Sequence, residues 1–486
     1  MIYKLRPYQE ECVKSISDYI NSDRHDPVLI VGPVGCGKSL LIAEAARLMG
    51  DKTLILQPSK ELLQQNHDKI TSYGIPATIY SASCGKKELS NMIYATLGSI
   101  KKVVGQLKEM GIRNVLIDEA HAGYSPEDGS EFMTFMNELK PKKVIGFTAT
   151  PCRLKTMSIG QVSYSQLNFI TRMRPVYFKN LIHVIQVEEM IRQGFWTPLK
   201  YETWDFNGDA LKLNSNGSEY TAESISEAVR KNGLNNLILR RLMVLKDVCR
   251  SILVFMDSVE SCNTAAEWMN AKICAGMAEV VHGGTPKKQR EAIVERFKSG
   301  GTRVVFNYSA LGTGFDHPGL DCVIVGRPTF SFSSFYQWLG RAVRIKDGKD
   351  SALVVDCCNN SSRFGDIRKL SIENYKGYGW GMFIGDKLIT NIPMGDKVTK
   401  TDLDIKAAKK DRRRGLAQGV TAAPVPGRPD HPLGSTVMTF GKYCGWMLHS
   451  IPVSYFKFIN ETFDWDNDRN KDIKEYIDFL IKNNRL

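Results

Sequence analysis

The feature that constrains this chain most is a glycine-rich run placed directly after a short apolar segment. The run PVLIVG (27–32) leads into Gly32-Pro-Val-Gly35-Cys-Gly37-Lys38-Ser39, and the helical pattern KSLLIAEAARLM follows. The three glycines let backbone N–H groups surround a phosphate, and the N-terminus of the helix adds its positive dipole. Lys38 can reach the outer phosphates, and the Ser39 hydroxyl can bind Mg²⁺. The spacing therefore predicts a strand–loop–helix unit that binds a nucleoside triphosphate.

Two similar series of β-rich apolar runs predict two parallel sheets. Helical patterns separate the runs, as in βαβ units. We therefore expect an α/β fold with two tandem parallel-sheet domains and a ligand cleft outside the carboxyl ends of the strands. The first series is 27–32, 53–58, 91–96, 114–119 and 144–149, and the second is 251–257, 279–284, 302–308, 322–328 and 352–358.

Composition shifts divide the chain further. We predict a first parallel-sheet domain over 1–155, a connecting segment over 156–245, a second such domain over 246–375, a basic and Pro/Gly-rich linker over 376–435, and a small aromatic-rich module over 436–486. Inside the connecting segment, 179–202 predicts a helix that ends near Gly194 and is followed by an extended lead into the second domain. Residues 207–220 are rich in Asn, Gly and Ser and predict an exposed loop.

Composition excludes several classes of protein. The chain has 486 residues, of which 43% are hydrophobic and 24% charged, as in ordinary globular proteins. No apolar run is long enough for a membrane span, and the first residues lack a secretory apolar segment. The 11 cysteines form no paired C-x-x-C pattern, so we expect reduced thiols, no zinc and a cytoplasmic location. The net charge of +13 favours a polyanionic partner only weakly.

A second motif follows the apolar run NVLI. Asp118-Glu119-Ala-His121 places two carboxylates at the end of a predicted strand. Asp118 can hold Mg²⁺, and Glu119 can orient or deprotonate the water that attacks the γ-phosphate. Alone, such a pair would suggest a solvated acidic loop, but its position about eighty residues after the phosphate loop favours catalysis. Thr148 and Thr150 follow the next strand, where their hydroxyls could relay the state of the nucleotide.

The second half of the chain carries arginines at helical spacing. Leu311-Gly-Thr-Gly314-Phe-Asp316 follows one strand, and Gln337-Trp-Leu-Gly-Arg341-Ala-Val-Arg344 begins as a helix. Arg341 and Arg344 are three residues apart and share one helical face. They could complete a γ-phosphate site as arginine fingers from the second domain. A solvated basic helix is the alternative.

This order of motifs resembles superfamily 2 helicases and translocases of the DEAD/DEAH-box type. Leu5-Arg6-Pro-Tyr-Gln9 resembles the Q motif, LQPSKELLQQ motif Ia, DEAH motif II, TATPCR motif III, VFMDS motif IV, LGTGFD motif V and QWLGRAVR motif VI. The resemblance implies two tandem RecA-like P-loop domains that bind ATP and Mg²⁺ between them. It also implies that Gln9 reads adenine, and it places the residues Arg6, Gly314, Asp316 and Gln337 around the nucleotide and His121 in the coupling of hydrolysis to movement.

Within that superfamily, LRPYQ, FTATPCRL and MIRQGFWTPL resemble RadD-like bacterial repair helicases and phage branch-migration helicases. This implies a DNA helicase that unwinds or branch-migrates forked or branched DNA in replication, recombination or repair, in a bacterial cell or a phage-infected host. The cysteine-rich zinc region of RadD-like proteins is not present, so zinc is not carried over. The ending TFGKYCGWMLHSIPVSYFKFI resembles a small module found at the tails of some nucleases and phage proteins.

Several residues are candidates for contacts with a nucleic-acid strand. Hydroxyls and backbone amides in such a fold contact phosphates without reading bases. An RNA helicase and a non-hydrolysing nucleic-acid-binding scaffold are the alternative functions, and intact Lys38, Glu119, Arg341 and Arg344 argue against the scaffold. A nuclease would need an acidic metal cluster outside the motor, and none is recognisable in the sequence. The strand-contact candidates are Pro58, Ser59, Thr96, Gly284, Thr285, Thr313, Lys442 and Trp446.

Overall fold

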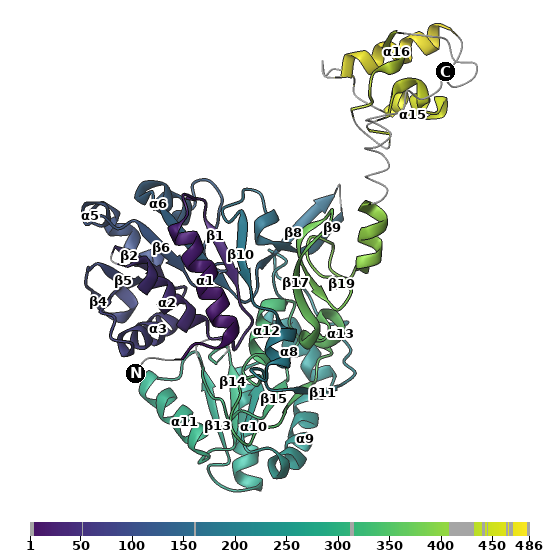
Figure 1. Ribbon diagram of the computed structural model, residues 1–486. Helices are drawn as coiled ribbons and strands as arrows, with labels where there is room; N and C mark the ends of the chain where they lie inside the picture. The colour runs from purple at the N-terminus through teal and green to yellow at the C-terminus, as the bar shows by residue number, and fades with distance from the viewer. Residues whose placement is uncertain are drawn as a thin grey trace. The chain divides into compact units, whose positions relative to one another are not determined.

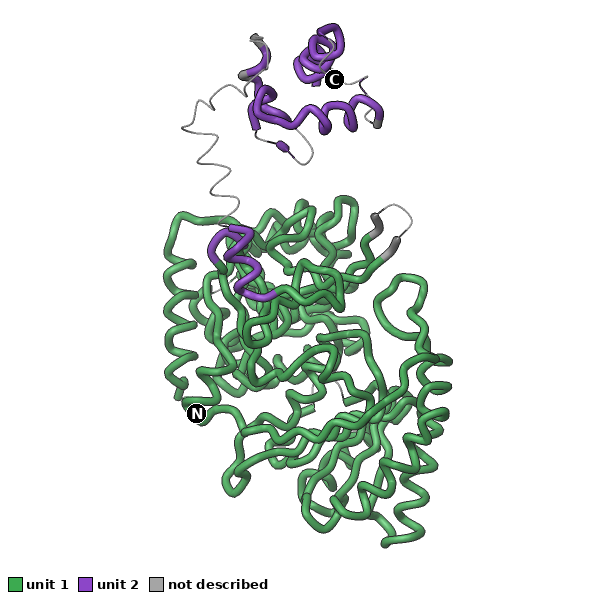
Figure 2. Tube along the Cα trace, turned by 90° about the vertical axis from the view of Figure 1, so that its right-hand side faces the viewer, with its two compact units in different colours: residues 1–375, 379–398 green, residues 376–378, 399–486 purple. Residues whose placement is uncertain are grey.

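The computed structural model describes residues 4–50, 52–159, 162–311, 315–407, 432–439, 443–444, 446–462, 465 and 470–483. The chain divides into two compact units (Figure 2), residues 1–375 with 379–398, and residues 376–378 with 399–486. The larger unit contains both predicted sheets and the helices that cover them (Figure 1). Within the described part of the chain, no helix combines the length and the apolar character needed to cross a bilayer.

The first sheet has eight strands and is parallel except at its last strand. Its order is β10-β1-β7-β6-β2-β5-β3-β4, and β4 runs antiparallel to β3. The central strands are buried along their whole length, which explains why they are read in the sequence as continuous apolar runs. The bounds are β1 (Val28–Val31), β2 (Thr53–Leu56), β3 (Thr78–Ser81), β4 (Lys86–Lys87), β5 (Met92–Ala95), β6 (Asn114–Ile117), β7 (Lys143–Thr148) and β10 (Asn180–Val184).

The second sheet has six parallel strands in the order β11-β16-β15-β12-β14-β13. Five of its strands match the second series of apolar runs. The two sheets therefore confirm the predicted α/β fold class with tandem parallel-sheet domains. The bounds are β11 (Leu199–Thr203), β12 (Ile252–Phe255), β13 (Ala278–His282), β14 (Val304–Tyr308), β15 (Cys322–Val325) and β16 (Ala352–Asp356).

Helices connect the strands and pack on the faces of both sheets (Figure 1). Several begin at a serine whose hydroxyl accepts a hydrogen bond from a backbone N–H in the first turn, as at Ser59, Ser258 and Ser331. The bounds are α1 (Pro7–Asn21), α2 (Lys38–Met49), α3 (Lys60–Ser72), α4 (Leu97–Ile100), α5 (Val104–Glu109), α6 (Glu131–Leu139), α7 (Val187–Arg192), α8 (Ala222–Lys231), α9 (Leu234–Val248), α10 (Val259–Lys272), α11 (Lys287–Ser299), α12 (Phe332–Leu339) and α13 (Asn360–Phe364).

The connecting segment differs from its prediction. Residues 180–184 form β10, which pairs with β1, because this Ile/Val-containing stretch completes the open edge of the first sheet. The predicted helix is confined to α7, which precedes Gly194, and Leu199–Thr203 is a strand of the second sheet. The first sheet thus extends past the predicted boundary at 155, and the second begins well before 246. Residues 207–220 form the predicted loop, which is exposed at 207–209 but packs through Leu211 and Tyr220 against the core around the second sheet.

Two antiparallel elements were not predicted. A hairpin of β8 (Cys152–Ile159) and β9 (Val162–Phe169) follows β7 directly. A four-stranded sheet consists of β17 (Leu370–Tyr375), β18 (Gly379–Ile384), β19 (Lys387–Leu388) and β20 (Val398–Thr399). The predicted linker over 376–435 is therefore folded in its first part, because WGMFI supplies apolar side chains to this sheet. Residues 408–431 lie outside the described residues.

The C-terminal module has a small core of its own. The helices α15 (Val453–Thr462) and α16 (Lys471–Lys482) surround buried residues such as Phe456, Ile477 and Leu480. Trp446 packs against this core, with its ring centroid 5.4 Å from that of Tyr443. The indole predicted to stack on nucleic acid is thus partly used in packing, because so small a module needs its aromatic side chains to exclude water.

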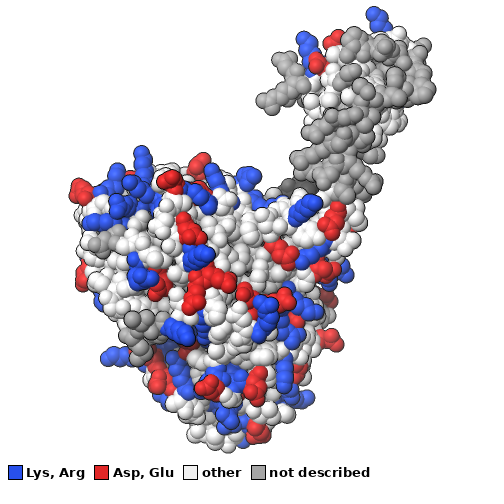
Figure 3. Space-filling view, viewed as in Figure 1, with Lys and Arg blue, Asp and Glu red and all other residues white. Residues whose placement is uncertain are grey.

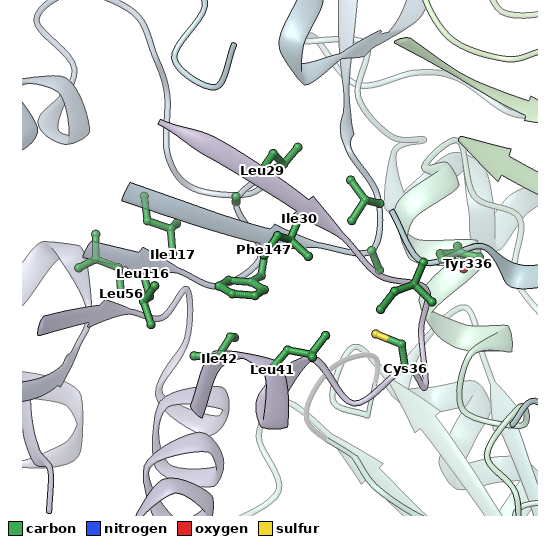
Figure 4. Close-up of a cluster of buried hydrophobic side chains, with 14 of the residues drawn as sticks. Leu29, Ile30, Cys36, Leu41, Ile42, Leu56, Leu116, Ile117, Phe147 and Tyr336 are labelled. Atoms are coloured by element: carbon green, nitrogen blue, oxygen red, sulfur yellow. The ribbon is translucent and has the colours of Figure 1, made fainter. Parts of the chain in front are cut away.

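The larger unit's core fixes the phosphate loop from both sides. Ile30 of β1 and Phe147 of β7 point toward Leu41 and Ile42 of α2, whereas Leu29 lies on the other face of β1 (Figure 4). This packing sets the distance and angle between the strand that enters the glycine-rich run and the helix that leaves it. The phosphate loop between β1 and α2 is therefore positioned by the packing of these two elements, and its own residues need not be apolar.

Candidate active site

The glycine-rich run adopts a conformation that its glycines make possible. Gly35 and Gly37 both have φ +84°, in the left-handed region of backbone conformation that is unfavourable for residues with a Cβ atom. A Cβ atom on Gly37 would also lie 2.6 Å from the side-chain amide of Gln9. At the start of the run, Gly32 N–H donates to the carbonyl of Thr148 at 3.0 Å. Lys38 and Ser39 then begin α2, so the N-terminus of that helix points at the enclosed space.

The residues of the Q motif form hydrogen bonds with the backbone of the phosphate loop. Gln9 Nε2 donates to the Cys36 carbonyl at 2.8 Å, and Gln9 Oε1 accepts from the backbone N–H of Arg6 at 2.9 Å. The amide of Gln9 is therefore engaged with the phosphate loop and with the start of α1. The guanidinium of Arg6 lies 4.7 Å from the ring centroid of Phe195, and both side chains line the cavity described below. Phe195 was not predicted.

The carboxylates lie where the strand series places them. Asp118 is buried, and its oxygens accept from Asn66 Nδ2 at 3.0 Å and from the Glu119 N–H at 2.9 Å. Burial, together with the charge of Glu119, raises the pKa of Asp118 to about 6. Glu119 pairs with Lys38 across 2.7 Å. Burial alone would raise the pKa of Glu119, but Lys38 and His121 hold it below its ordinary value.

The predicted coupling residues form one hydrogen-bonded chain that reaches the second domain. His121 Nδ1 lies 2.8 Å from Thr148 Oγ1, and His121 Nε2 lies 3.2 Å from Ser333 Oγ on α12. Ser333 Oγ is also 3.1 Å from Thr150 Oγ1. Burial lowers the pKa of His121 to about 4, so its ring is neutral at pH 7 and can donate at one nitrogen while accepting at the other. Ser333 was not predicted, because nothing in its local sequence marks it.

Residues of both sheets line one cavity of about 340 Å³. The first sheet contributes Lys38 and Glu119, and the second contributes Arg341 and Arg344. Arg341 Nη1 donates to the Phe315 carbonyl at 2.6 Å, and burial lowers the pKa of Arg341 to about 9. The lining as a whole includes Arg6, Gly35, Gly37, Lys38, Ser39, Glu119, Phe195, Asp316, Gln337, Arg341 and Arg344.

Arg344 sits at the same wall of the cavity. It forms a salt bridge with Asp316 and donates to the Phe315 carbonyl at 3.2 Å. Burial lowers the pKa of Arg344, although Asp316 opposes that effect. Two of the predicted positions in this region, Thr313 and Gly314, lie outside the described residues.

The predicted strand-contact residues are not gathered into the cavity. Pro58 is exposed, whereas the Ser59 hydroxyl caps α3 by accepting from Leu62 N–H at 3.3 Å. Thr96 Oγ1 donates to Ser99 Oγ at 3.2 Å. Thr285 is buried, and its hydroxyl accepts from the His282 N–H at 3.0 Å.

Two strand-contact positions remain. Gly284 is exposed, and its N–H donates to His282 Nδ1 at 3.1 Å. Lys442 lies outside the described residues. The contacts of this whole set with nucleic acid therefore stay predictions, and several of its hydroxyls have structural partners within the protein.

The positive charge is not collected into one stripe on the face that Figure 3 shows. Lys and Arg lie there among Asp and Glu over both halves of the larger unit. The positive excess behind the net charge of +13 is therefore not concentrated at one binding surface on this face. A track for a polyanion along it would depend on backbone amides and hydroxyls as much as on cations.

Two family descriptions match the chain in the order of the two sheets. "Type III restriction enzyme, res subunit" matches residues 2–153, and "Helicase conserved C-terminal domain" matches residues 235–346. The matches cover the phosphate loop and both carboxylates in the first region and both arginines in the second.

Individual proteins resemble the chain at lower identity. A 51.5 kDa protein of Lactococcus phage (isolate 7-9) is 24% identical over 332 residues, which cover 68% of this chain and 65% of that protein. The putative ATP-dependent helicase IRC3 of Saccharomyces cerevisiae is 24% identical over 279 residues, covering 57% of this chain and 38% of that protein. The matched regions thus span less than two thirds of either relative.

A solved structure shares the fold. The ATP-dependent Type ISP restriction-modification enzyme LlaBIII bound to DNA superposes with a TM-score of 0.53 at 15% identity, covering 74% of this chain and 28% of that chain. Its likeness shows the tandem RecA-like arrangement. With both domain matches and the motifs in family order, the chain belongs to superfamily 2 of the ATP-dependent helicases and translocases.

Proposed function

We propose that this protein hydrolyses ATP between its two RecA-like domains and uses the cycle to move along DNA. One observation carries the proposal: Lys38 and Glu119 from one sheet line the same cavity as Arg341 and Arg344 from the other. A γ-phosphate in that cavity would meet cations from both domains and a carboxylate from one. Such an arrangement stabilises charge that develops during phosphoryl transfer, and it depends on the two domains being together.

The ion pair between Lys38 and Glu119 marks where the phosphates would bind. Lys38 is the cation that reaches the outer phosphates in a loop of this kind, so bound ATP would draw it away from Glu119. Glu119 Oε2 is buried and has no hydrogen-bond donor among the described residues, although His121 Nδ1 lies 3.4 Å away. A carboxylate oxygen in that state can accept a proton from an attacking water.

Ser39 and Asp118, beside the ion pair, have the oxygen ligands that suit a magnesium ion. Burial and the charge of Glu119 raise the pKa of Asp118 more than Lys38 lowers it, and a divalent ion would favour the charged form of this carboxylate. Ser39 at the start of α2 and Asp118 at the end of β6 would hold the ion. When bound, Mg²⁺ would neutralise charge on the phosphate oxygens of ATP.

Movement along a strand would follow from closing and opening the cleft. ATP joins the domains through its phosphates, and hydrolysis removes the group that both domains hold. The hydrogen-bonded chain from His121 and Thr150 to Ser333 crosses the same boundary, so it can report whether the cleft is closed. Each closure would advance one domain along the track if the two domains grip it alternately.

DNA is the proposed track, and forked or branched DNA in replication, recombination or repair is the proposed substrate. The family description of the first domain names a restriction enzyme subunit, and LlaBIII was solved bound to DNA. An RNA helicase is the second candidate, since the DEAH sequence occurs in both classes. A non-hydrolysing scaffold is disfavoured by the complete set of cavity residues.

The test measures ATP hydrolysis with single-stranded DNA, forked DNA and RNA of equal length. We expect DNA to stimulate turnover more than RNA, and forked DNA to be unwound. Stimulation by RNA alone would replace the proposal with the RNA helicase. ATP binding without turnover on any of the three nucleic acids would favour the scaffold.

A further inference from the structure

Three consecutive residues in the crossover between the two sheets touch three different parts of the nucleotide cavity. Phe195, Trp196 and Thr197 lie between α7, which follows β10 of the first sheet in the chain, and β11, which belongs to the second sheet. The ring of Phe195 lines the cavity beside Arg6. The side chains of the next two residues do not line the cavity, but they form hydrogen bonds to the backbone of residues that do.

Trp196 is bonded to the phosphate loop. Its indole Nε1–H donates to the carbonyl of Val34 at 2.8 Å, and the side chain is only 2% exposed. The same nitrogen lies 3.4 Å from where a Cβ atom on Gly35 would be. The indole therefore rests directly against the tip of the loop that would enclose the phosphates.

Thr197 is bonded to the arginine-bearing segment. Its backbone N–H donates to the Val343 carbonyl at 2.8 Å, and its Oγ1 donates to the Arg344 carbonyl at 2.7 Å. Thr197 is 2% exposed, so both bonds are shielded from water. The backbone of the residue whose guanidinium lines the cavity is thus fixed by a neighbour of Trp196.

We propose that Trp196 and Thr197 are positioning residues that hold the phosphate loop and Arg344 at one fixed spacing. The inference rests on the proposed ATP hydrolysis. Because the two residues are adjacent in the chain, a displacement of the arginine segment is transmitted to the Val34 carbonyl through a single peptide unit. Their effect on turnover is exerted through Arg344 and the phosphate loop, not by contact with the nucleotide.

Both residues use a polar group where an apolar one would fill the same space. A phenylalanine at 196 or a valine at 197 would keep most of the packing but lose the hydrogen bond. The Val34 carbonyl would lose its indole donor, and the Arg344 carbonyl would keep only Lys349 Nζ, which lies 2.8 Å from it. A shift of about 1 Å in a group that acts on the reacting atoms can lower the rate by about a hundred-fold. The geometry therefore predicts a kinetic effect larger than the effect on folding.

The first experiment compares Thr197→Val with Thr197→Ser. Thr197→Val should lower kcat for ATP by about ten-fold or more, with the dissociation constant for ATP changed less than about three-fold, since Arg344 acts on the transition state. Thr197→Ser keeps the hydroxyl and should restore most of the rate. Thr203→Val is the matched control: Thr203 lies in β11, and its hydroxyl bonds to Ser361 Oγ away from the cavity.

The second experiment compares Trp196→Phe with Trp204→Phe. Trp204 Nε1 also donates a hydrogen bond, to Glu202 Oε1 at 2.9 Å, but it lies outside the cavity. Trp196→Phe should weaken ATP binding in calorimetry and lower kcat, whereas Trp204→Phe should change neither. If Trp196→Phe does not fold by circular dichroism, the Thr197 series decides alone.

A double-mutant comparison separates positioning from general damage. In an Arg344→Ala background, Thr197→Val should lower the remaining kcat by less than about two-fold, because its route to the phosphate is already removed. An equal loss in both backgrounds would overturn the inference, as would Thr197→Val matching Thr203→Val. A wild-type protein that binds ATP but never hydrolyses it would instead overturn the proposed function and leave the calorimetry of Trp196→Phe as the test of loop positioning.

Discussion

At the residue scale, Glu119 gives the sharpest prediction about the cavity. Glu119→Gln removes the carboxylate that would take the proton from water, yet keeps the shape of the side chain. We expect ATP binding to persist and DNA-stimulated turnover to fall by about a hundred-fold or more. Because the ion pair with Lys38 is also lost, ATP affinity should be equal or higher. Near-normal turnover of Glu119→Gln in a coupled phosphate-release assay would remove Glu119 from the role of base.

His317 gives a residue-scale prediction about pH. It is buried against the Phe297 ring with its Nε2 2.8 Å from Ser251 Oγ, and burial, followed by the charge of Lys346, lowers its pKa to about 4. The folded protein therefore resists protonation that the unfolded chain accepts below about pH 6.5, so stability falls as pH drops from 6.5 toward 4. His317→Gln should lose less stability than wild type between pH 7 and pH 5, by about 2 kcal/mol. Thermal melts of both proteins at the two pH values measure this, and parallel curves would contradict it.

The site residues that sequence reasoning reached share one property. Lys38, Asp118, Glu119 and Arg341 each sit in a short motif whose own spacing implies its position at a strand end or a helix start. Trp196 and Ser333 make bonds to segments more than a hundred residues away, and no local pattern encodes such a pairing. Long-range partners of this kind follow from the packing of the two domains and become visible only in three dimensions.

At the element scale, α1 is held by an unusual cap, and this gives a prediction about stability. Lys143 at the start of β7 is buried, and its Nζ donates to the carbonyls of Tyr19, Ser22 and Arg24 at 2.9, 2.7 and 2.6 Å. A cation at a helix C-terminus satisfies carbonyls that lack partners within the helix. Lys143→Met should lower the free energy of unfolding by about 2 kcal/mol, whereas Lys142→Met, at an exposed neighbour, should change it little. Equal melting temperatures for the two variants would show that the cap is dispensable.

The elements themselves were predictable to different degrees. Strands in the middle of each parallel sheet are buried on both faces, so continuous apolar runs marked them. β10 carries mixed side chains at a sheet edge, with His183 among them, and this mixed pattern predicts a helix rather than a strand. The hairpin β8–β9 contains Arg153, Lys155 and several Ser, which do not form an apolar run. Its strands pair with each other, and its buried residues Cys152, Leu167 and Phe169 join the core without forming a continuous apolar run.

At the scale of the whole molecule, the structure places the end of the motor later than the sequence does. Asn391 N–H donates to the Leu167 carbonyl at 2.7 Å, and its Oδ1 accepts from the Phe169 N–H at 3.2 Å. Met394 N–H donates to the Ser165 carbonyl at 2.8 Å. Residues 391–394 thus complete the hairpin that follows β7, although their composition resembles that of a linker. A chain that ends at 390 would expose this edge of β9.

Two truncations test this boundary and the proposed role of the C-terminal module together. A chain ending at 407 should melt within a few degrees of the full-length larger unit and keep its basal ATP hydrolysis, because every residue lining the cavity lies before 346. A chain ending at 390 loses three backbone-directed hydrogen bonds to β9 and should unfold at a clearly lower temperature.

We further propose that residues 408–486 anchor DNA, since this region holds the basic run up to Arg414 and an exposed Phe458. The 407 truncation should then bind and unwind forked DNA less well while hydrolysing ATP at the basal rate, which fluorescence anisotropy and strand-separation assays can follow. Equal melting temperatures of the two truncations would show that residues 391–394 do not stabilise the motor, as the composition-based boundary at 375 predicts. Unchanged fork binding by the 407 truncation would assign DNA binding to the two motor domains alone.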